Sequence, residues 1–91
     1  METGEKRTVA VNVGGKGYTL VSSDPAEHVQ RVAALADRTL REIALSTRQS
    51  VQQSAVLAVI SLADEVIKAQ DENSRLRREI QGLRTEAAKD R

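Results

Sequence analysis

The stretch from residue 51 to residue 91 constrains this chain most, because it contains no proline and a single glycine, Gly82. Proline and glycine oppose a helix interior more strongly than any other residue, so their scarcity favours one continuous helix. About 40 residues of helix extend roughly 60 Å at 1.5 Å per residue. A chain of 91 residues leaves only a small head beside such a helix.

The side chains available for a core indicate self-association. Tyr18 is the only aromatic residue, and the chain has neither tryptophan nor phenylalanine. A chain of this length buries only roughly 60% of its unfolded surface, so a monomer core of Val, Leu, Ile and Ala is thin. We therefore expect a second copy of the chain to cover apolar surface.

The long helix changes character along its length. Over residues 55–67 apolar side chains point in nearly every direction, which is typical of a helix buried on all sides. After Lys68 the large apolar side chains occur mainly along one stripe of the helix, the seam, with a seven-residue repeat. Heptad positions a and d are Ala55, Val59, Leu62, Val66, Ala69, Asn73, Leu76, Ile80, Leu83 and Ala87, and all of them except Ala87 form the predicted dimer interface.

The charges beside the seam predict the relative direction of the two helices. In a parallel coiled coil, position g of one chain faces position e of the next heptad in its partner. The predicted interchain ion pairs are Glu72–Arg77, Glu79–Arg84 and Glu86–Arg91. An antiparallel dimer would instead oppose like charges, and the single Asn73 in the seam also favours a parallel pair. The alternative is an ordinary solvated helix whose charges pair within one chain.

The N-terminal half predicts a β-hairpin. Val9, Val11 and Val13 alternate with polar or small residues, as in a half-buried strand. The Gly-rich segment "GGKG" then connects to a second short strand, in which Tyr18 and Leu20 share a face.

An amphipathic helix follows the hairpin over residues 25–45. Asp24 stands where an N-cap belongs, and Pro25 suits the first helical position. Steps of three and four residues form one apolar stripe, which consists of Val29, Val32, Ala33, Ala36, Leu40 and Ile43. The polar segment "STRQS" ends this helix, and Ser50 with Gln53 forms a capping box for the long helix.

The predicted fold class is therefore α+β. A small head, made of a β-hairpin and one amphipathic helix, precedes a long C-terminal helix that forms a parallel dimeric coiled coil. Residues 1–7 are predicted to be a disordered N-terminus. The predicted head spans residues 8–67, with the hairpin at 8–21, the first helix at 25–45 and the start of the long helix at 50–67. Residues 68–91 are the predicted coiled coil.

Charge and composition argue against several classes of function. Lys and Arg number 14 against 13 Asp and Glu, so the basic excess typical of nucleic-acid or membrane binding is missing. The absence of cysteine and the single histidine argue against disulfides, thiol nucleophiles and a histidine-rich metal site. No window has the length of a membrane span, and the opening segment lacks the apolar core of a signal peptide. We expect a cytoplasmic protein without cofactor or metal.

Three features of the sequence are candidates for chemistry or for nucleic-acid binding. "GGKG" lacks the spacing of a phosphate-binding loop and no helix begins directly after it, so a hairpin turn is the better interpretation. His28 has no nucleophile or ligand cluster near it in the sequence. The cluster of Arg75, Arg77 and Arg78 is flanked by acids and lacks a basic stripe ahead of the coiled coil. The sequence therefore predicts a protein that is not an enzyme.

The order of these segments resembles the ZapA family of bacterial cell-division proteins. The hairpin "VNVGGKGYTL", the helix "DPAEHVQRVAALADRTLREI" and the long-helix stretch "AVLAVISLADEVIKAQDEN" carry the resemblance. It covers residues 8–73, and the rest of the chain agrees with it as a coiled coil.

The resemblance implies a cytoplasmic protein at the mid-cell division site that binds FtsZ, the tubulin-like division GTPase, and promotes bundling or alignment of its filaments. It implies a homodimer along the long helix and, in some members, a tetramer of two dimers. The implied FtsZ-binding positions are Lys16 in the hairpin turn, Arg48 in the interhelical loop and Gln52, where some relatives carry an acid. The residues themselves leave open a coiled-coil dimeric nucleic-acid-binding or regulatory protein.

Overall fold

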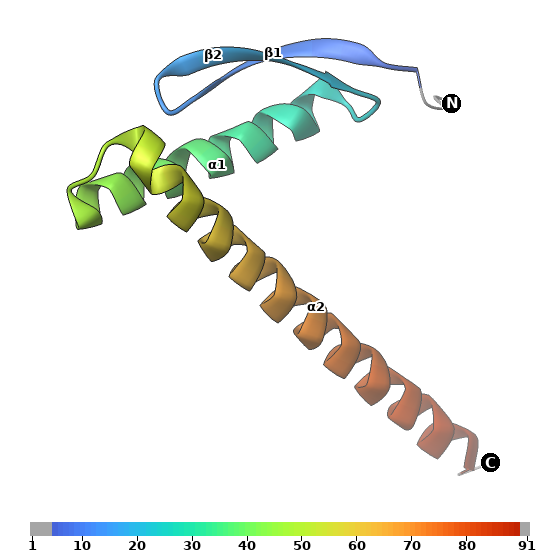
Figure 1. The fold of residues 1–91 in the computed structure, drawn as a ribbon. Helices are drawn as coiled ribbons and strands as arrows, with labels where there is room; N and C mark the ends of the chain where they lie inside the picture. Colours follow the sequence, from blue (N-terminus) through green and yellow to red (C-terminus); the bar gives the residue numbers. More distant parts are fainter. Residues whose placement is uncertain (1–4, 90–91) are drawn as a thin grey trace. The chain divides into compact units, whose positions relative to one another are not determined.

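The computed structural model describes residues 5–89, which form two strands and then two helices (Figure 1). Strand β1 spans Arg7–Val13, β2 spans Lys16–Ser22, helix α1 spans Ala26–Thr47 and α2 spans Val51–Lys89. The predicted α+β class, with a hairpin, an amphipathic helix and a long second helix, is confirmed. The hairpin begins one residue earlier than predicted, so Arg7 belongs to β1 rather than to a disordered segment. Two predictions concern residues outside the described range: the disordered N-terminus, which includes residues 1–4, and the ion pair of Glu86 with Arg91.

The two strands pair antiparallel with a loop of only two residues. Val13 lies opposite Lys16, so Gly14 and Gly15 alone make the turn. Their φ angles of 64° and 84° are both positive, as a type I′ hairpin turn requires, and glycine adopts them without steric cost. Lys16, which the sequence placed in the turn, is therefore the first residue of β2.

The core lies between β1 and α1. Val9 and Val11 form a buried cluster with Val29 and Ala33 of α1, and Val13 packs against it. The predicted inner face of the first strand is thus confirmed, and Figure 1 shows the hairpin lying along α1. The register places Tyr18 and Leu20 of β2 opposite Val11 and Val9, on the same face of the sheet, yet both stay exposed.

The start of α1 differs from the prediction by one residue. Pro25 occupies the N-cap with an extended ψ of 147°, and the N–H of Val29 donates to its carbonyl oxygen at 3.1 Å. Asp24 was predicted to cap this helix, but no side chain makes a cap hydrogen bond there. Because the helix begins at Ala26, Asp24 stands one position too early to reach the free N–H groups of the first turn.

The link between the helices is short and well hydrogen-bonded. Arg48 takes a left-handed conformation (φ 58°, ψ 35°), and the N–H groups of Arg48 and Gln49 both donate to the carbonyl of Ala44. The predicted capping box at α2 is confirmed: the Gln53 N–H donates to Ser50 Oγ at 3.1 Å, and the Ser50 N–H donates to Gln53 Oε1 at 3.3 Å.

The chain divides into two compact units inside α2, between Val59 and Ile60. We call the described residues up to Val59 the head. The prediction placed this boundary after residue 67. In the α2 portion of the head, Ser54 and Ala58 are buried and Val51 is half-buried. The buried hydroxyl of Ser54 donates to the Ser50 carbonyl at 2.8 Å, so it is satisfied.

Candidate functional site

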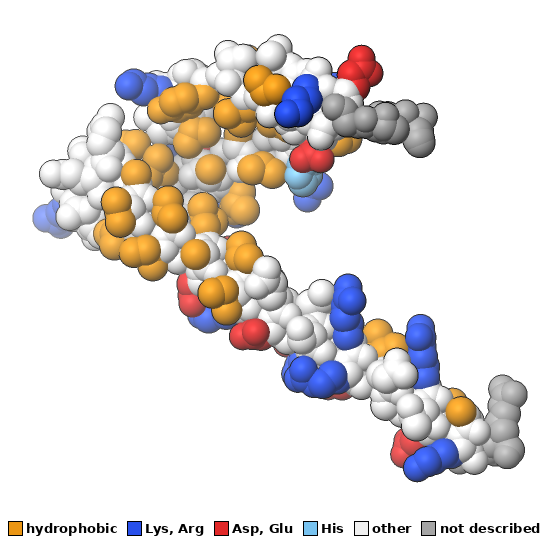
Figure 2. All heavy atoms as spheres, turned by 45° about the vertical axis from the view of Figure 1, so that its right-hand side comes forward, with side chains coloured by type: hydrophobic (Ala, Val, Ile, Leu, Met, Phe, Trp, Pro, Cys, Tyr) orange, Lys and Arg blue, Asp and Glu red, His pale blue; other side chains and the backbone are white. Residues whose placement is uncertain are grey.

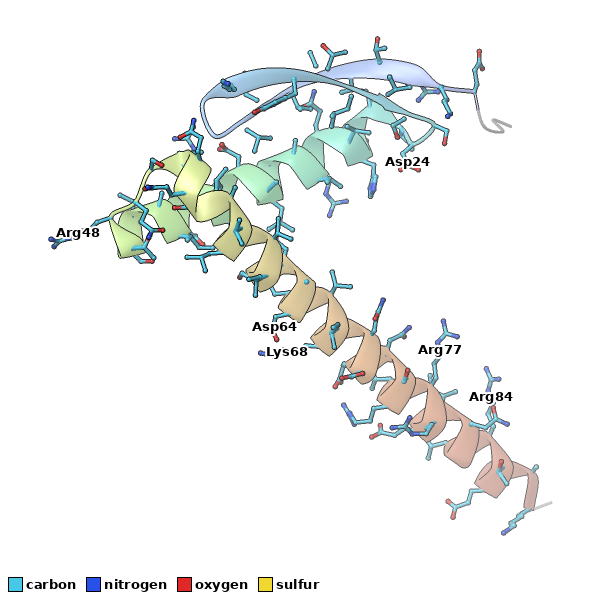
Figure 3. The ribbon with its side chains drawn as sticks, viewed as in Figure 1. Asp24, Arg48, Asp64, Lys68, Arg77 and Arg84 are labelled. Carbon is cyan, nitrogen blue, oxygen red and sulfur yellow. The ribbon has the colours of Figure 1, made fainter. Side chains whose placement is uncertain are left out.

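The three predicted binding residues are all exposed, but the structure groups only two of them. Lys16 and Gln52 line the same surface pocket of about 230 Å³, together with Tyr18 of β2. Arg48 does not line this pocket, and its side chain extends outward from the link between the helices (Figure 3). The two predicted cations, Lys16 and Arg48, are therefore both accessible, at separate positions on the head.

The hairpin turn is fixed to α1 by one carboxylate. The Gly14 N–H donates to Asp37 Oδ1 at 2.8 Å, across 23 residues of sequence, and Arg41 Nε donates to Asp37 Oδ2 at 2.8 Å. The hydrogen bond from Gly14, followed by the bond from Arg41, lowers the pKa of Asp37 because both donors favour the charged form. Sequence reasoning missed Asp37, although an acid bordering the apolar stripe of a helix was a usable signal.

Three segments of the head converge at Gly14. A Cβ atom at this position would lie 2.7 Å from Val51 Cγ1 and 3.0 Å from Leu40 Cδ2. The turn, the C-terminal half of α1 and the first residue of α2 therefore approach one another closely. Gly15 has no atom within 4 Å of the corresponding position. The turn is thus packed on the side of Gly14 and open on the side of Gly15.

Arg48 is the only non-glycine residue with a positive φ angle among the described residues. A side chain in the left-handed region costs about 1–2 kcal/mol, which is why glycine is the usual residue after a helix C-terminus. Arg48 therefore occupies a position at which a glycine would relieve backbone strain.

The described part of the chain shows neither a metal cluster nor a single membrane-spanning helix. Within residues 5–89, no group of three or more His, Asp and Glu side chains is placed to hold a metal ion. Neither α1 nor α2 by itself is both long enough and apolar enough to cross a membrane. His28 lies exposed in the first turn of α1.

Comparison with known proteins places these features in a family. The family model described as "Cell division protein ZapA" matches residues 9–91, which include the hairpin, α1 and α2. The chain belongs to the ZapA family of cell division proteins. The resemblance identified in the sequence is thereby confirmed.

Individual ZapA proteins agree with this assignment. The chain is 32% identical over 80 residues to the cell division protein ZapA of Geobacillus kaustophilus, a match that covers 86% of this chain and 88% of that one. The ZapA of Bacillus licheniformis is 27% identical over 81 residues, covering 88% and 95%. The solved structure "ZapA mutant dimer from Geobacillus stearothermophilus" superimposes with a TM-score of 0.69 at 30% identity, covering 89% of this chain and 95% of that one.

The dimeric ZapA neighbour supports self-association, and α2 carries an uncovered apolar surface that suits it. Figure 2 shows hydrophobic side chains gathered over the start of α2 and sparser toward its end. Of the predicted interface, Leu62 is half-buried and all the other residues are exposed in the single chain; the large apolar ones among them are Val59, Val66, Leu76, Ile80 and Leu83. Val59, for example, is 67% exposed.

The charges beside this ZapA seam are partly paired within the helix. Arg75 binds the carboxylates of both Glu72 and Glu79. Intrahelical pairing, the alternative to interchain pairing, is thus present for two of the three glutamates that were predicted to pair across the dimer. Arg77 and Arg84 project from the same side of α2 (Figure 3), and neither has an ion-pair partner within residues 5–89.

A second intrahelical pair lies nearer the head. Lys68 Nζ lies 2.9 Å from Asp64 Oδ2, and the hydrogen bond to this carboxylate raises the pKa of Lys68. Both side chains are well exposed, so the pair supports the helix only weakly.

Proposed function

We propose that this chain is a non-enzymatic cell-division protein that binds FtsZ filaments and promotes their bundling or alignment in the division ring at mid-cell. The observation that carries the proposal is the ZapA family match over residues 9–91, because it spans the head and the long helix together.

The proposed filament contact is cationic and lies on the head. FtsZ-type filaments are generally acidic, an implication of the family resemblance, so exposed Lys16 and Arg48 suit them by charge. Non-glycine residues held in a strained backbone conformation are common at functional sites. Arg48 meets that condition, because its left-handed conformation would be relieved by glycine. Gln52 shares the pocket of Lys16 and would contribute hydrogen bonds rather than charge.

The proposed assembly is a parallel homodimer along α2. A parallel arrangement covers the exposed seam and brings Arg77 and Arg84 to the partner's glutamates, where each exposed pair contributes about 0.2–1 kcal/mol. Such pairs select orientation more than they add stability. The dimer carries two filament contacts, which raises binding by avidity. A tetramer of two dimers is the larger alternative, although the outer positions Asp71, Arg78 and Thr85 are polar.

Co-sedimentation with polymerised FtsZ tests the proposal. The wild-type chain should pellet with filaments, and the Lys16→Glu, Arg48→Glu double variant should not, because two attractive contacts become repulsive. Far-UV circular dichroism and sedimentation velocity should show unchanged helix content and unchanged dimer mass, since both residues are exposed. The wild-type interaction should weaken as salt rises.

Two outcomes would contradict the proposal. Full bundling by the folded double variant would remove Lys16 and Arg48 from the contact. Salt-sensitive binding to duplex DNA in a gel shift, without binding to FtsZ, would favour the nucleic-acid alternative instead.

A further inference from the structure

The backbone N–H of Gly14, in the hairpin loop, has no hydrogen-bond acceptor within the hairpin itself. The register ends at the pair Val13–Lys16, so the N–H groups of the two loop residues lie outside the strand pairing. An N–H group that turns toward protein rather than water needs an acceptor. Gly14 has one in Asp37 Oδ1 at 2.8 Å, supplied by α1.

The acceptor is itself held in place. Arg41, one helical turn further along α1, binds the second oxygen of Asp37 at 2.8 Å. The Asp37 side chain is only 25% exposed, whereas that of Arg41 is 61% exposed. The side chains of Leu40 and Val51 pack closely against Gly14 of the turn. Asp37 therefore makes the polar attachment of the turn to the rest of the head.

We propose that Asp37 is a positioning residue for the filament contact: it holds the Gly14–Gly15 turn against α1 and thereby fixes where Lys16 is presented. The inference rests on the proposed function, because it concerns the same contact. Lys16 follows Gly14 by two residues and opens β2, so any rotation of the turn moves its ammonium group. Asp37 need not touch the filament to do this.

A purely electrostatic role for Asp37 predicts the opposite result. If Asp37 acted only through its charge, its removal would strengthen binding to an acidic filament, because Arg41 would lose its carboxylate partner and become available. If Asp37 acts by position, removal weakens binding although the head becomes more positive. The sign of the effect therefore distinguishes the two roles.

The test uses four single variants of the full chain in co-sedimentation with polymerised FtsZ. Asp37→Ala removes the acceptor and the charge, and its affinity should fall about tenfold if the released turn adopts the binding conformation about one-tenth of the time. Asp37→Asn keeps an oxygen that can accept from Gly14 and should bind close to wild type. Asp24→Ala removes one negative charge from the head without touching the turn, and it should bind at least as well as wild type. Lys16→Glu reports on the contact itself.

Hydrogen exchange of the Gly14 amide gives an independent readout. This amide should be protected in wild type and in Asp37→Asn, and it should exchange freely in Asp37→Ala. If Asp37→Ala does not fold, Asp37→Glu replaces it: the charge is kept but the oxygens are displaced by one methylene, so binding should still weaken.

The outcomes separate the inference from the function on which it rests. Binding by Asp37→Ala equal to or tighter than wild type, while Lys16→Glu loses binding, would overturn the positioning role and leave the contact intact. Undiminished binding by Lys16→Glu would overturn the contact at Lys16 and the positioning role with it. Loss of binding by Asp37→Ala and Lys16→Glu, with Asp37→Asn near wild type, would support both.

Discussion

Replacing Gly14 by alanine should destabilise the head by about 2–5 kcal/mol, a loss that combines two separate costs. The first is the backbone: with φ at 64°, an L-residue pays about 1–2 kcal/mol for the left-handed region. The second is space, because the new Cβ would lie 2.7 Å from Val51 Cγ1 and 3.0 Å from Leu40 Cδ2. Overpacking of this kind typically costs about 1–3 kcal/mol.

Two other glycines isolate these costs. Gly15→Ala has the same backbone penalty, since its φ is 84°, but nothing lies within 4 Å of its Cβ position. It should therefore cost only about 1–2 kcal/mol, and Gly15→Asn less, because asparagine tolerates the left-handed region. Gly82→Ala lies in the interior of α2 with open space around it, and it should stabilise the helix by about 0.8–1 kcal/mol.

Urea denaturation followed by far-UV circular dichroism measures the stability of all four variants. The variants must be compared at one protein concentration, because association couples unfolding to the amount of protein. The order of stability should be Gly82→Ala above wild type, then Gly15→Ala, then Gly14→Ala. If Gly14→Ala were no less stable than Gly15→Ala, the close approach of the turn, α1 and the start of α2 would be refuted.

Three further predictions concern the dimer, the strained link and pH. Arg77→Glu with Arg84→Glu should weaken a parallel dimer in analytical ultracentrifugation. Adding Glu72→Lys and Glu79→Lys, which reverse the predicted partners, should restore dimerisation. Unchanged dimerisation in every variant would refute the predicted pairs. Arg48→Gly should raise the free energy of unfolding by up to about 1 kcal/mol, because the relief of backbone strain exceeds the extra entropy that glycine gives the unfolded chain. Bundling of FtsZ should nevertheless fall, and full bundling would exclude a contact at Arg48. Because its folded pKa is lowered, Asp37 should stabilise the head above its ordinary pKa of about 4 and lose this contribution as pH falls through the folded value. Asp37→Asn should therefore make urea-unfolding stability less sensitive to acid below about pH 4, and an unchanged acid profile would contradict the assignment.

Patterns carried by neighbouring residues were enough to predict the elements. The alternation of Val9, Val11 and Val13 predicted a strand with one buried face, and the Ser50–Gln53 box predicted the start of α2. Both depend on residues within one turn or one pleat of each other, so no knowledge of the chain path is required. The family resemblance came from the order of such local segments, and the family match over residues 9–91 confirmed it.

The arrangement around the candidate site was decided only by the tertiary structure. The bond between Gly14 and Asp37 joins residues 23 positions apart, and the approach of Val51 to the turn spans a still longer stretch. A local sequence pattern cannot predict either contact, because each depends on how the hairpin and the two helices pack together in three dimensions. The same reason explains why Lys16 was predicted in the turn. The sequence shows a four-residue Gly-rich segment, but only the strand pairing decides that Gly14 and Gly15 make the turn and that Lys16 begins β2.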